Sequence, residues 1–321
     1  MRVAQYVRRR VAGGVLLLVG VSILSFLLSA LVPGDFLDEM RLNPQISPEV
    51  LTQLRSQYGL DRPLAERYVH WLGSAAHGNF GFSFSYNMPV SSLIWNRCRN
   101  TLLLAGTATM IIWIIALPLG ILTATRSVYV DRVLTAGCSL LLSLPELAII
   151  LALLAFAVRS GAVPVGGMTS VTGTLNGGSF SADVARHLVV PVLALVLVGL
   201  PVVLQHTRSA MKAALEAPFI KAARGHGVGS LRLVLRHAFP VAANPVISLF
   251  GLSVAGLVGS SLLAEVITGW PGLGPLFVQS IFARDFYVVI AVVMLSSGFL
   301  VIGNLVGDLL LCTVDPRIRT D

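Results

Sequence analysis

The sequence predicts an all-α polytopic membrane protein with six transmembrane helices. Of its 321 residues, 55% are hydrophobic and only 12% are charged, and the mean hydropathy is +0.82. Soluble domains carry about 25% charged residues, so this composition is suited to a lipid environment. Apolar runs long enough to cross about 30 Å of hydrocarbon recur along the chain. They lie at residues 11–32, 101–124, 133–158, 241–264 and 288–311, with a shorter run at 188–204.

The first apolar run and the distribution of cations predict the orientation of the chain. This run follows Arg8, Arg9 and Arg10 and is longer than the apolar core of about 7–15 residues in a cleaved signal peptide, so we expect it to remain as the first span. With the N-terminus inside, the short internal segments hold most of the Lys and Arg residues. Most of the external cations lie in one long loop, and long loops are largely exempt from the positive-inside rule. We therefore expect both termini in the cytoplasm.

The alternation of apolar and polar segments divides the chain into three parts. Residues 1–32 form the cytoplasmic amino tail and the first span, and residues 33–100 form a large external, periplasmic loop. Residues 101–321 form a five-span core, which includes an internal loop at 208–237. Several spans contain proline, which frees backbone carbonyls and bends helices where neighbouring groups can satisfy them. Bent helices around a cavity are therefore expected.

Motifs of enzymes and metal sites are missing from the sequence. The only lysines, Lys212 and Lys221, are each followed by alanine, so no G-x-x-x-x-G-K-[ST] phosphate loop exists, and H-E-x-x-H and G-x-S-x-G are also absent. The three cysteines show no C-x-x-C spacing, and the six histidines show no strong ligand spacing. We expect no catalytic, cofactor or metal site. The excess of eight cations lies at the ends of apolar runs, which favours anionic lipid over nucleic acid as a partner.

A short amphipathic segment, "FIKAARGHG", lies in the internal loop at 208–237. Pro218 suits the first position of a helix and Gly227 suits its C-terminal stop, so a short helix on the inner membrane surface is predicted. Its cations would suit a helix that lies on anionic lipid. Its small residues and glycine allow another backbone to approach closely, which favours docking to a soluble partner instead. The residues expected to form this contact are Phe219, Lys221, Ala222, Ala223, Arg224 and Gly227.

An acidic residue, Glu146, follows Pro145 within the third apolar run. An acid inside the membrane is costly and usually faces a cavity or a partner, so Pro145 and Glu146 are candidate pathway residues. A protonated or paired structural glutamate is the alternative. An ion-coupled secondary transporter that uses Glu146 is the alternative function, although no inverted repeat is evident in the sequence.

Ordered motifs over almost the whole chain resemble one transport family. They are "YVRRRVAGGVLLLVGVSILSFLLSALVPGD", "YGLDRPLAERYVHWL", "HGNFGFSF", "NTLLLA", "HLVVPVLAL", "TRSAM", "FIKAARGHG" with "HAFP", "EVITGWPGLGPLFVQSIFARDF" and "NLVGDLLLCTVDPRIR". The series is similar to that of ATP-binding-cassette importer permeases, within them the dipeptide, oligopeptide and nickel family. The chain departs from the family pattern at Asn79, Pro218 and His226 and lacks the glutamate expected near Lys221.

The resemblance implies a type I importer permease fold in a bacterial cytoplasmic (inner) membrane. Such a chain forms half of a pore with a second, similar permease, and it couples through its cytoplasmic helix to two ATPase subunits that bind ATP and Mg²⁺. A periplasmic or lipid-anchored solute-binding protein delivers the substrate. The chain itself would then be no enzyme. Dipeptides, oligopeptides, nickel chelates and glutathione all fit this plan, so the substrate stays open.

The external loop before the last span is the third candidate site. It begins "EVITGWPGLG", in which Trp270 suits an interfacial aromatic belt and Pro271 and Gly272 favour tight turns. In the family that it resembles, this loop lies near the dock of the binding protein. Glu265, Trp270, Pro271 and Gly272 are therefore candidate docking residues, and a simple interfacial anchor is the alternative.

Overall fold

Long apolar helices dominate the structure, a computed structural model that describes residues 2–31, 34, 36, 47–57, 59–125, 128–170 and 179–314. Five helices in this part of the chain are long and apolar enough to cross a membrane, and each coincides with a predicted apolar run. They are α1 (Arg2–Leu31), α5 (Val90–Thr125), α8 (Phe180–Glu216), α11 (Phe239–Thr268) and α13 (Phe286–Val314).

The third predicted span is broken into two helices. Helix α6 (Val128–Ser143) and helix α7 (Glu146–Ser160) meet at an angle of 97°. The break falls at Pro145, which has no N–H to donate and which disfavours a helical conformation at the residue before it. The six predicted spans are recovered only if this bent pair counts as one. Residues 133–158, which were predicted as one span, therefore contain a sharp corner.

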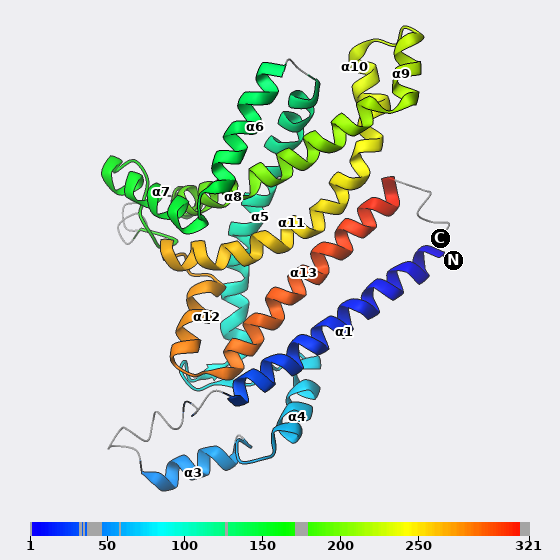
Figure 1. Ribbon diagram of the computed structural model, residues 1–321. Coiled ribbons are helices and arrows are strands. Elements are labelled where there is room, and N and C mark those ends of the chain that lie inside the picture. The colour runs from blue at the N-terminus through cyan, green and yellow to red at the C-terminus, as the bar shows by residue number, and fades with distance from the viewer. Residues whose placement is uncertain are drawn as a thin grey trace.

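The core of the molecule is the bundle of α5, α8 and α11, which cross in the centre of the molecule (Figure 1). Helices α5 and α8 approach closely at Gly120, where an added Cβ would lie 2.6 Å from the Cβ of Thr207. A second close approach occurs at Gly199, where an added Cβ would lie 2.7 Å from Ile112. Glycine at these two positions therefore lets the bundle pack tightly.

Helix α1 lies alongside α13 and outside this bundle (Figure 1). Its C-terminal half packs on α4 (Leu64–Ala76), where the rings of Phe26 and Trp71 are 5.0 Å apart and the hydroxyls of Ser22 and Tyr68 are 2.9 Å apart. Much of the apolar surface of α1 stays exposed, including Leu16 at 74%. This exposure suits contact with lipid or with another membrane subunit.

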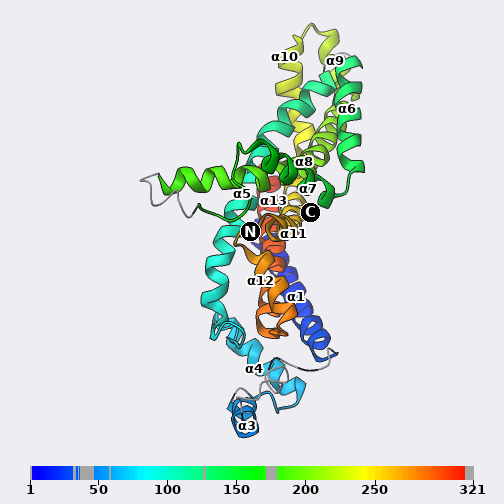
Figure 2. The ribbon, with the colours of Figure 1, turned by 90° about the vertical axis from the view of Figure 1, so that its left-hand side faces the viewer.

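The two ends of the molecule carry different short elements (Figure 2). One end holds α3 and α4 and, nearby, a two-stranded antiparallel ribbon and α12. The opposite end holds the hairpin that contains α9 and α10. These short elements are α3 (Pro48–Gln57), β1 (Phe82–Ser83), β2 (Met88–Pro89), α9 (Pro218–Gly225), α10 (Ser230–Arg232), a π-helix η1 (Leu233–Ala238) and α12 (Leu273–Phe282).

Asp285 joins the ribbon to the turn before α13. Its carboxylate accepts a hydrogen bond of 2.6 Å from the Ser83 hydroxyl and one of 3.2 Å from the backbone N–H of Ser85. The side chain is buried, and burial raises the pKa of this carboxyl above its ordinary value. The contact ties a segment before α5 to a segment that follows α12.

The internal loop predicted at 208–237 is mostly helical in the structure. Its first residues continue α8, whose 37 residues span about 55 Å at 1.5 Å per residue. This length exceeds a hydrocarbon core of about 30 Å, so α8 extends beyond the membrane. The extension carries α9 away from the transmembrane bundle.

Candidate functional site

The predicted short helix is present as α9, and it has one buried and one exposed face. Pro218 occupies its first turn, as predicted, and Ile220 is fully buried in a cluster with Met211 of α8 and Leu233 of η1. Phe219 is 47% exposed although it is a large apolar residue. Ile220 therefore fixes the helix to the protein, and Phe219 remains available for another contact.

The exposed face of α9 combines small and basic residues. Lys221, Ala222 and Arg224 are exposed, and Ala223 is half-buried against the cluster around Ile220. The face therefore presents two cations and an exposed alanine next to the Phe219 ring. Five of the six residues predicted for this contact thus lie on a single short helix.

The sixth, Gly227, lies just beyond the end of α9. Its φ is +81°, in the left-handed region that glycine adopts without strain, and its N–H donates to the carbonyl of Arg224 at 3.0 Å. The next N–H, that of Val228, donates to the carbonyl of Ala223 at 3.2 Å. An added Cβ at Gly227 would meet no atom within 4 Å. Glycine is therefore favoured at this position by the left-handed backbone and not by a shortage of space for a side chain.

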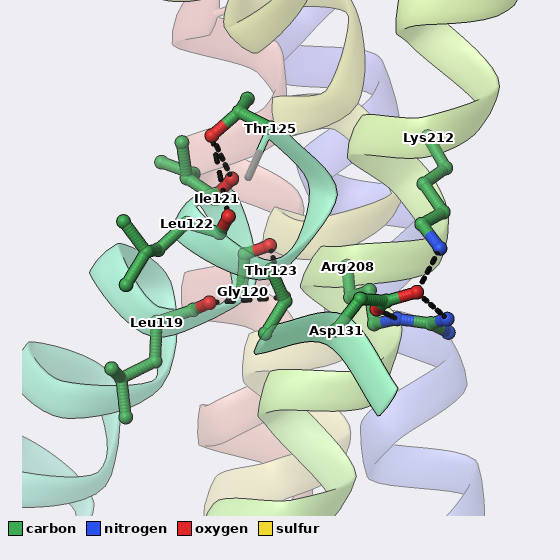
Figure 3. A network of polar contacts seen from close by, with 9 residues as sticks. All are labelled: Leu119, Gly120, Ile121, Leu122, Thr123, Thr125, Asp131, Arg208 and Lys212. Atoms are coloured by element: carbon green, nitrogen blue, oxygen red, sulfur yellow. Dashed lines mark hydrogen bonds and ion pairs between the residues drawn. The ribbon is translucent and has the colours of Figure 1, made fainter. Parts of the chain in front are cut away.

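An ion cluster ties α6 to the extension of α8 that leads into α9 (Figure 3). Both oxygens of Asp131 on α6 are engaged by the guanidinium of Arg208, with Nη2 2.9 Å from Oδ2, and Nζ of Lys212 lies 2.6 Å from Oδ2. Arg208 and Lys212 share one face of α8 because they are four residues apart. A bidentate contact of this kind fixes direction as well as distance.

This ion cluster was not expected from the sequence, because its partners are 77 and 81 residues apart. One available signal was the i, i+4 spacing of the two cations on an otherwise apolar chain. The nearby end of α5 is closed differently. There, the hydroxyls of Thr123 and Thr125 donate to carbonyls of their own helix (Figure 3). These threonine bonds stay within α5, whereas the bonds of Asp131 join α6 to α8.

A groove of about 1230 Å³ lies between the end of α5 and the hairpin. Pro118 and Leu122 line one side, and Arg224, Leu231 and Leu235 line the other. Leu231 and Leu235 are 72% and 53% exposed, so the hairpin does not pack tightly against α5. The hairpin is held by α8 and α11 and has open space on the side that faces α5.

Pro145 and Glu146, the candidate pathway residues, lie at the corner between α6 and α7. Pro145 is the N-cap residue of α7 and Glu146 is in its first turn. Glu146 is half-buried and interacts with Ser260 of α11, and its Oε1 has no hydrogen-bond partner among the described residues. The corner therefore brings an incompletely satisfied carboxylate to the side of the central bundle.

The third candidate site is an interlocked turn between α11 and α12. Glu265 and Trp270 are fully buried, and Oε2 of Glu265 accepts a bond of 2.7 Å from the N–H of Gly274. Nε1 of Trp270 donates to the carbonyl of Asn100 at 3.1 Å, and Nδ2 of Asn100 donates to the carbonyl of Pro271 at 2.8 Å. The turn is thus held against the start of α5.

Glycine is required in this turn for space. An added Cβ at Gly272 would collide with the carboxylate of Glu265, and one at Gly274 would collide with the backbone of Leu262. Because Glu265 and Trp270 are buried, they cannot themselves contact another protein in this conformation. Among the exposed apolar residues after this turn, Ile281 and Phe282 at the end of α12 are 48% and 80% exposed.

Two family models match the chain along most of its length. One, described as "Binding-protein-dependent transport system inner membrane component", matches residues 116–320. The other, described as the N-terminal part of the membrane component of binding-protein-dependent transport systems, matches residues 3–105. The first match includes the ion cluster, α9 and the α11–α12 turn.

Similar proteins match over nearly the full length of the chain. The oligopeptide transport system permease protein AppB of Bacillus subtilis (strain 168) is 35% identical, with 98% of this chain and 99% of that protein covered. The dipeptide transport system permease protein DppB of Escherichia coli (strain K12) is 30% identical, with 98% of each chain covered.

Among solved structures, a crystal structure of an amino acid ABC transporter with histidines matches with a TM-score of 0.52. It is 17% identical and covers 70% of this chain and 94% of that chain, so it supports the permease fold alone. The family matches and the full-length relatives go further. The chain belongs to the family of inner membrane permease components of binding-protein-dependent ATP-binding-cassette importers.

Proposed function

We propose that this chain forms half of the translocation pore of an ATP-driven importer for peptides and that α9 is its contact with an ATPase subunit. The observation that carries the proposal is the construction of α9. Ile220 anchors α9 to the protein, while Phe219 and the two cations of α9 remain exposed. The helix follows directly after α8, which is long enough to extend beyond the membrane. A half-exposed aromatic ring beside small residues is a suitable anchor for a protein groove.

The ion cluster supports a mechanical role for this helix. Arg208 and Lys212 lie on α8, which ends directly before α9, and Asp131 connects them to α6, which leads to the corner at Glu146. We infer that displacement of α9 is passed along α8 to α6 through this contact. The open groove beside the hairpin leaves room for such a displacement.

The partners follow from this assignment. A second, similar permease completes the pore, and two ATPase subunits bind ATP and Mg²⁺, since this chain carries no phosphate loop. In this proposal the chain lies in a bacterial inner membrane, with both termini and α9 on the cytoplasmic side. The opposite end, with α3, α4 and α12, then faces a periplasmic or lipid-anchored binding protein. The docking surface would be supported by the turn that contains Glu265, Trp270, Pro271 and Gly272. Exposed residues such as Phe282 would make the contact with the binding protein.

The substrate class rests on the relatives, whose names specify oligopeptide and dipeptide transport. Pro145 and Glu146 are proposed to line the pathway, where a carboxylate could attract the amino terminus of a peptide. Glu146→Gln is expected to slow peptide uptake without loss of the assembled complex. Unchanged uptake of cationic peptides by this variant would remove Glu146 from the pathway.

The test of the docking contact is Phe219→Ala. If the ring fills a pocket of the ATPase, its loss is expected to weaken docking by about 1–3 kcal/mol. The matched control is Phe180→Ala, which removes an equally apolar and 61% exposed ring at the other end of α8. The measurements are co-purification of the ATPase and stimulated ATP hydrolysis in reconstituted membranes. Equal retention of the ATPase by both variants would show that α9 is only a lipid-facing helix.

A further inference from the structure

A groove of about 520 Å³ lies between α1 and α13. Its volume is within the range of about 300–1,000 Å³ that is typical of ligand clefts. One wall carries Arg9, Gly13 and Leu17 of α1, which follow one another at intervals of four residues and so share a face. The groove therefore runs along the helix for about 12 Å at 1.5 Å per residue.

Both walls change from charged to apolar in the same direction. On α1, Arg9 and Arg10 give way to Gly13 and then to Leu17. On α13, which runs the opposite way, Asp308 gives way to Leu305 and the uncharged Asn304 and then to Val301 and Leu300. A ligand that fits this lining has an ionic group at one end and a hydrocarbon portion at the other, and it lies parallel to the membrane helices.

The charges in the groove favour an anionic ligand. Arg10 forms an ion pair with Asp308, with Nε 3.1 Å from Oδ2, so these two charges offset each other. Arg9 is exposed, lines the groove, and has no ion-pair partner among the residues that the structure describes. The remaining charge is therefore positive. A guanidinium suits a phosphate group because its N–H donors match phosphate geometry.

The hollow itself results from Gly13. An added Cβ at Gly13 would meet no atom within 4 Å, whereas one at Gly14 would lie 2.5 Å from Val301. Gly14 thus lets α1 approach α13 at the floor of the groove, and Gly13 leaves the space above it open. Leu17 is 41% exposed, so the apolar end of the groove is open to the surrounding lipid.

We propose that this groove is a binding site for one anionic phospholipid, with its phosphate at Arg9 and an acyl chain along Gly13 and Leu17. Basic pockets between membrane helices are a recurrent site for such headgroups. An apolar helix of another subunit would fit the Leu17 end but would leave Arg9 without a counter-charge in the groove. The proposal does not depend on the function proposed above, since it needs only that α1 and α13 lie in a membrane.

The test uses native mass spectrometry of the full chain in its purified complex, with phosphatidylglycerol or phosphatidylcholine of identical acyl chains added. One phosphatidylglycerol is expected to bind more tightly than phosphatidylcholine. Arg9→Gln is expected to weaken it roughly fivefold, which corresponds to one Arg contact near a membrane surface. The matched control is Arg8→Gln, which removes the same charge from a residue that does not line the groove and is expected to have less than a twofold effect.

A second pair of variants tests the apolar end. Gly13→Leu adds a side chain to the groove at a position where a Cβ meets no atom within 4 Å, and it is expected to reduce phosphatidylglycerol binding severalfold. Gly20→Leu, where an added Cβ also meets no atom within 4 Å, lies outside the groove and is expected to leave binding unchanged. Inorganic phosphate is expected not to displace the lipid, because it lacks the hydrocarbon portion. Equal effects of Arg9→Gln and Arg8→Gln, equal binding of both lipids, or displacement by phosphate would each overturn the proposal.

Discussion

The α9 hairpin and the α11–α12 turn lie toward opposite ends of the molecule, and they use glycine for opposite reasons. At Gly227 beyond α9, an added side chain would have space but would require a left-handed backbone. At Gly272 and Gly274, an added Cβ would collide with Glu265 and with the backbone of Leu262. The hairpin is attached through a small apolar cluster around Ile220, whereas the turn is fixed by hydrogen bonds from both sides.

This difference indicates which end of the chain can move. Motions that drive transport are expected where few buried contacts hold an element, since local opening there requires little free energy. The hairpin has an exposed outer face and an open groove on its α5 side. The turn has buried Glu265 and Trp270 at its centre. We therefore expect the outer turn to act as a rigid frame against which the inner hairpin moves.

The largest expected effect on stability is that of Gly274→Ala. The new Cβ collides with the backbone of Leu262, which cannot relax as a side-chain end could. Overpacking of this kind is expected to lower the free energy of unfolding by about 3 kcal/mol or more. Gly229→Ala is the control, because an added Cβ there meets nothing within 4 Å and its φ of −60° is ordinary for alanine. Thermal unfolding in detergent measures both, and a stable Gly274→Ala protein would contradict the rigid-frame interpretation.

An intermediate effect is expected from Asp131→Ala. This change leaves Arg208 and Lys212 without their common carboxylate, and hydrogen bonds to charged groups contribute about 1.5–3 kcal/mol. Because these side chains are partly exposed, we expect the lower part of this range. Transport is expected to fall further than stability if the cluster passes motion between α8 and α6.

A double-mutant cycle isolates this coupling. Asp131→Ala, Lys212→Ala and the double variant are compared for unfolding and for stimulated ATP hydrolysis. The two changes are expected to be non-additive in both measurements. Additive effects on hydrolysis would show that the cluster stabilises the fold without transmitting motion.

The sequence predicted the spans and the coupling helix because both depend on local patterns. Hydropathy located every apolar run, and Pro218 with Gly227 marked the limits of α9 to within about a residue. The corner at Pro145 could not be located in this way. Pro118, Pro191, Pro201 and Pro245 lie inside continuous helices, so a proline in a span does not by itself determine a break.

Long-range contacts account for the other differences. Trp270 and Glu265 were expected at an exposed interface, but Asn100 and Gly274 bind them in the interior. Nothing local to "EVITGWPGLG" indicates that the start of α5 covers it. The docking role predicted for α9, the pathway role of Glu146 and the dock at the outer turn all stay predictions, since geometry alone does not test them.

The smallest expected effect on stability, with a large effect on function, is that of Gly227→Val. A β-branched residue in the left-handed region is disfavoured by roughly 1–2 kcal/mol, and the end of α9 can fray to avoid this cost because it is exposed. Membrane insertion and unfolding temperature should therefore change little. Retention of the ATPase should fall, because Arg224 and the last turn of α9 lose their fixed direction.

Gly229→Val is the matched control, since Gly229 is two residues away, is equally open, and has φ −60° and ψ 144°, which valine adopts readily. If both variants retain the ATPase equally, the left-handed end of α9 has no role in docking. If both lose it equally, the requirement is for an unobstructed surface between α9 and α10, and the backbone argument for Gly227 does not hold.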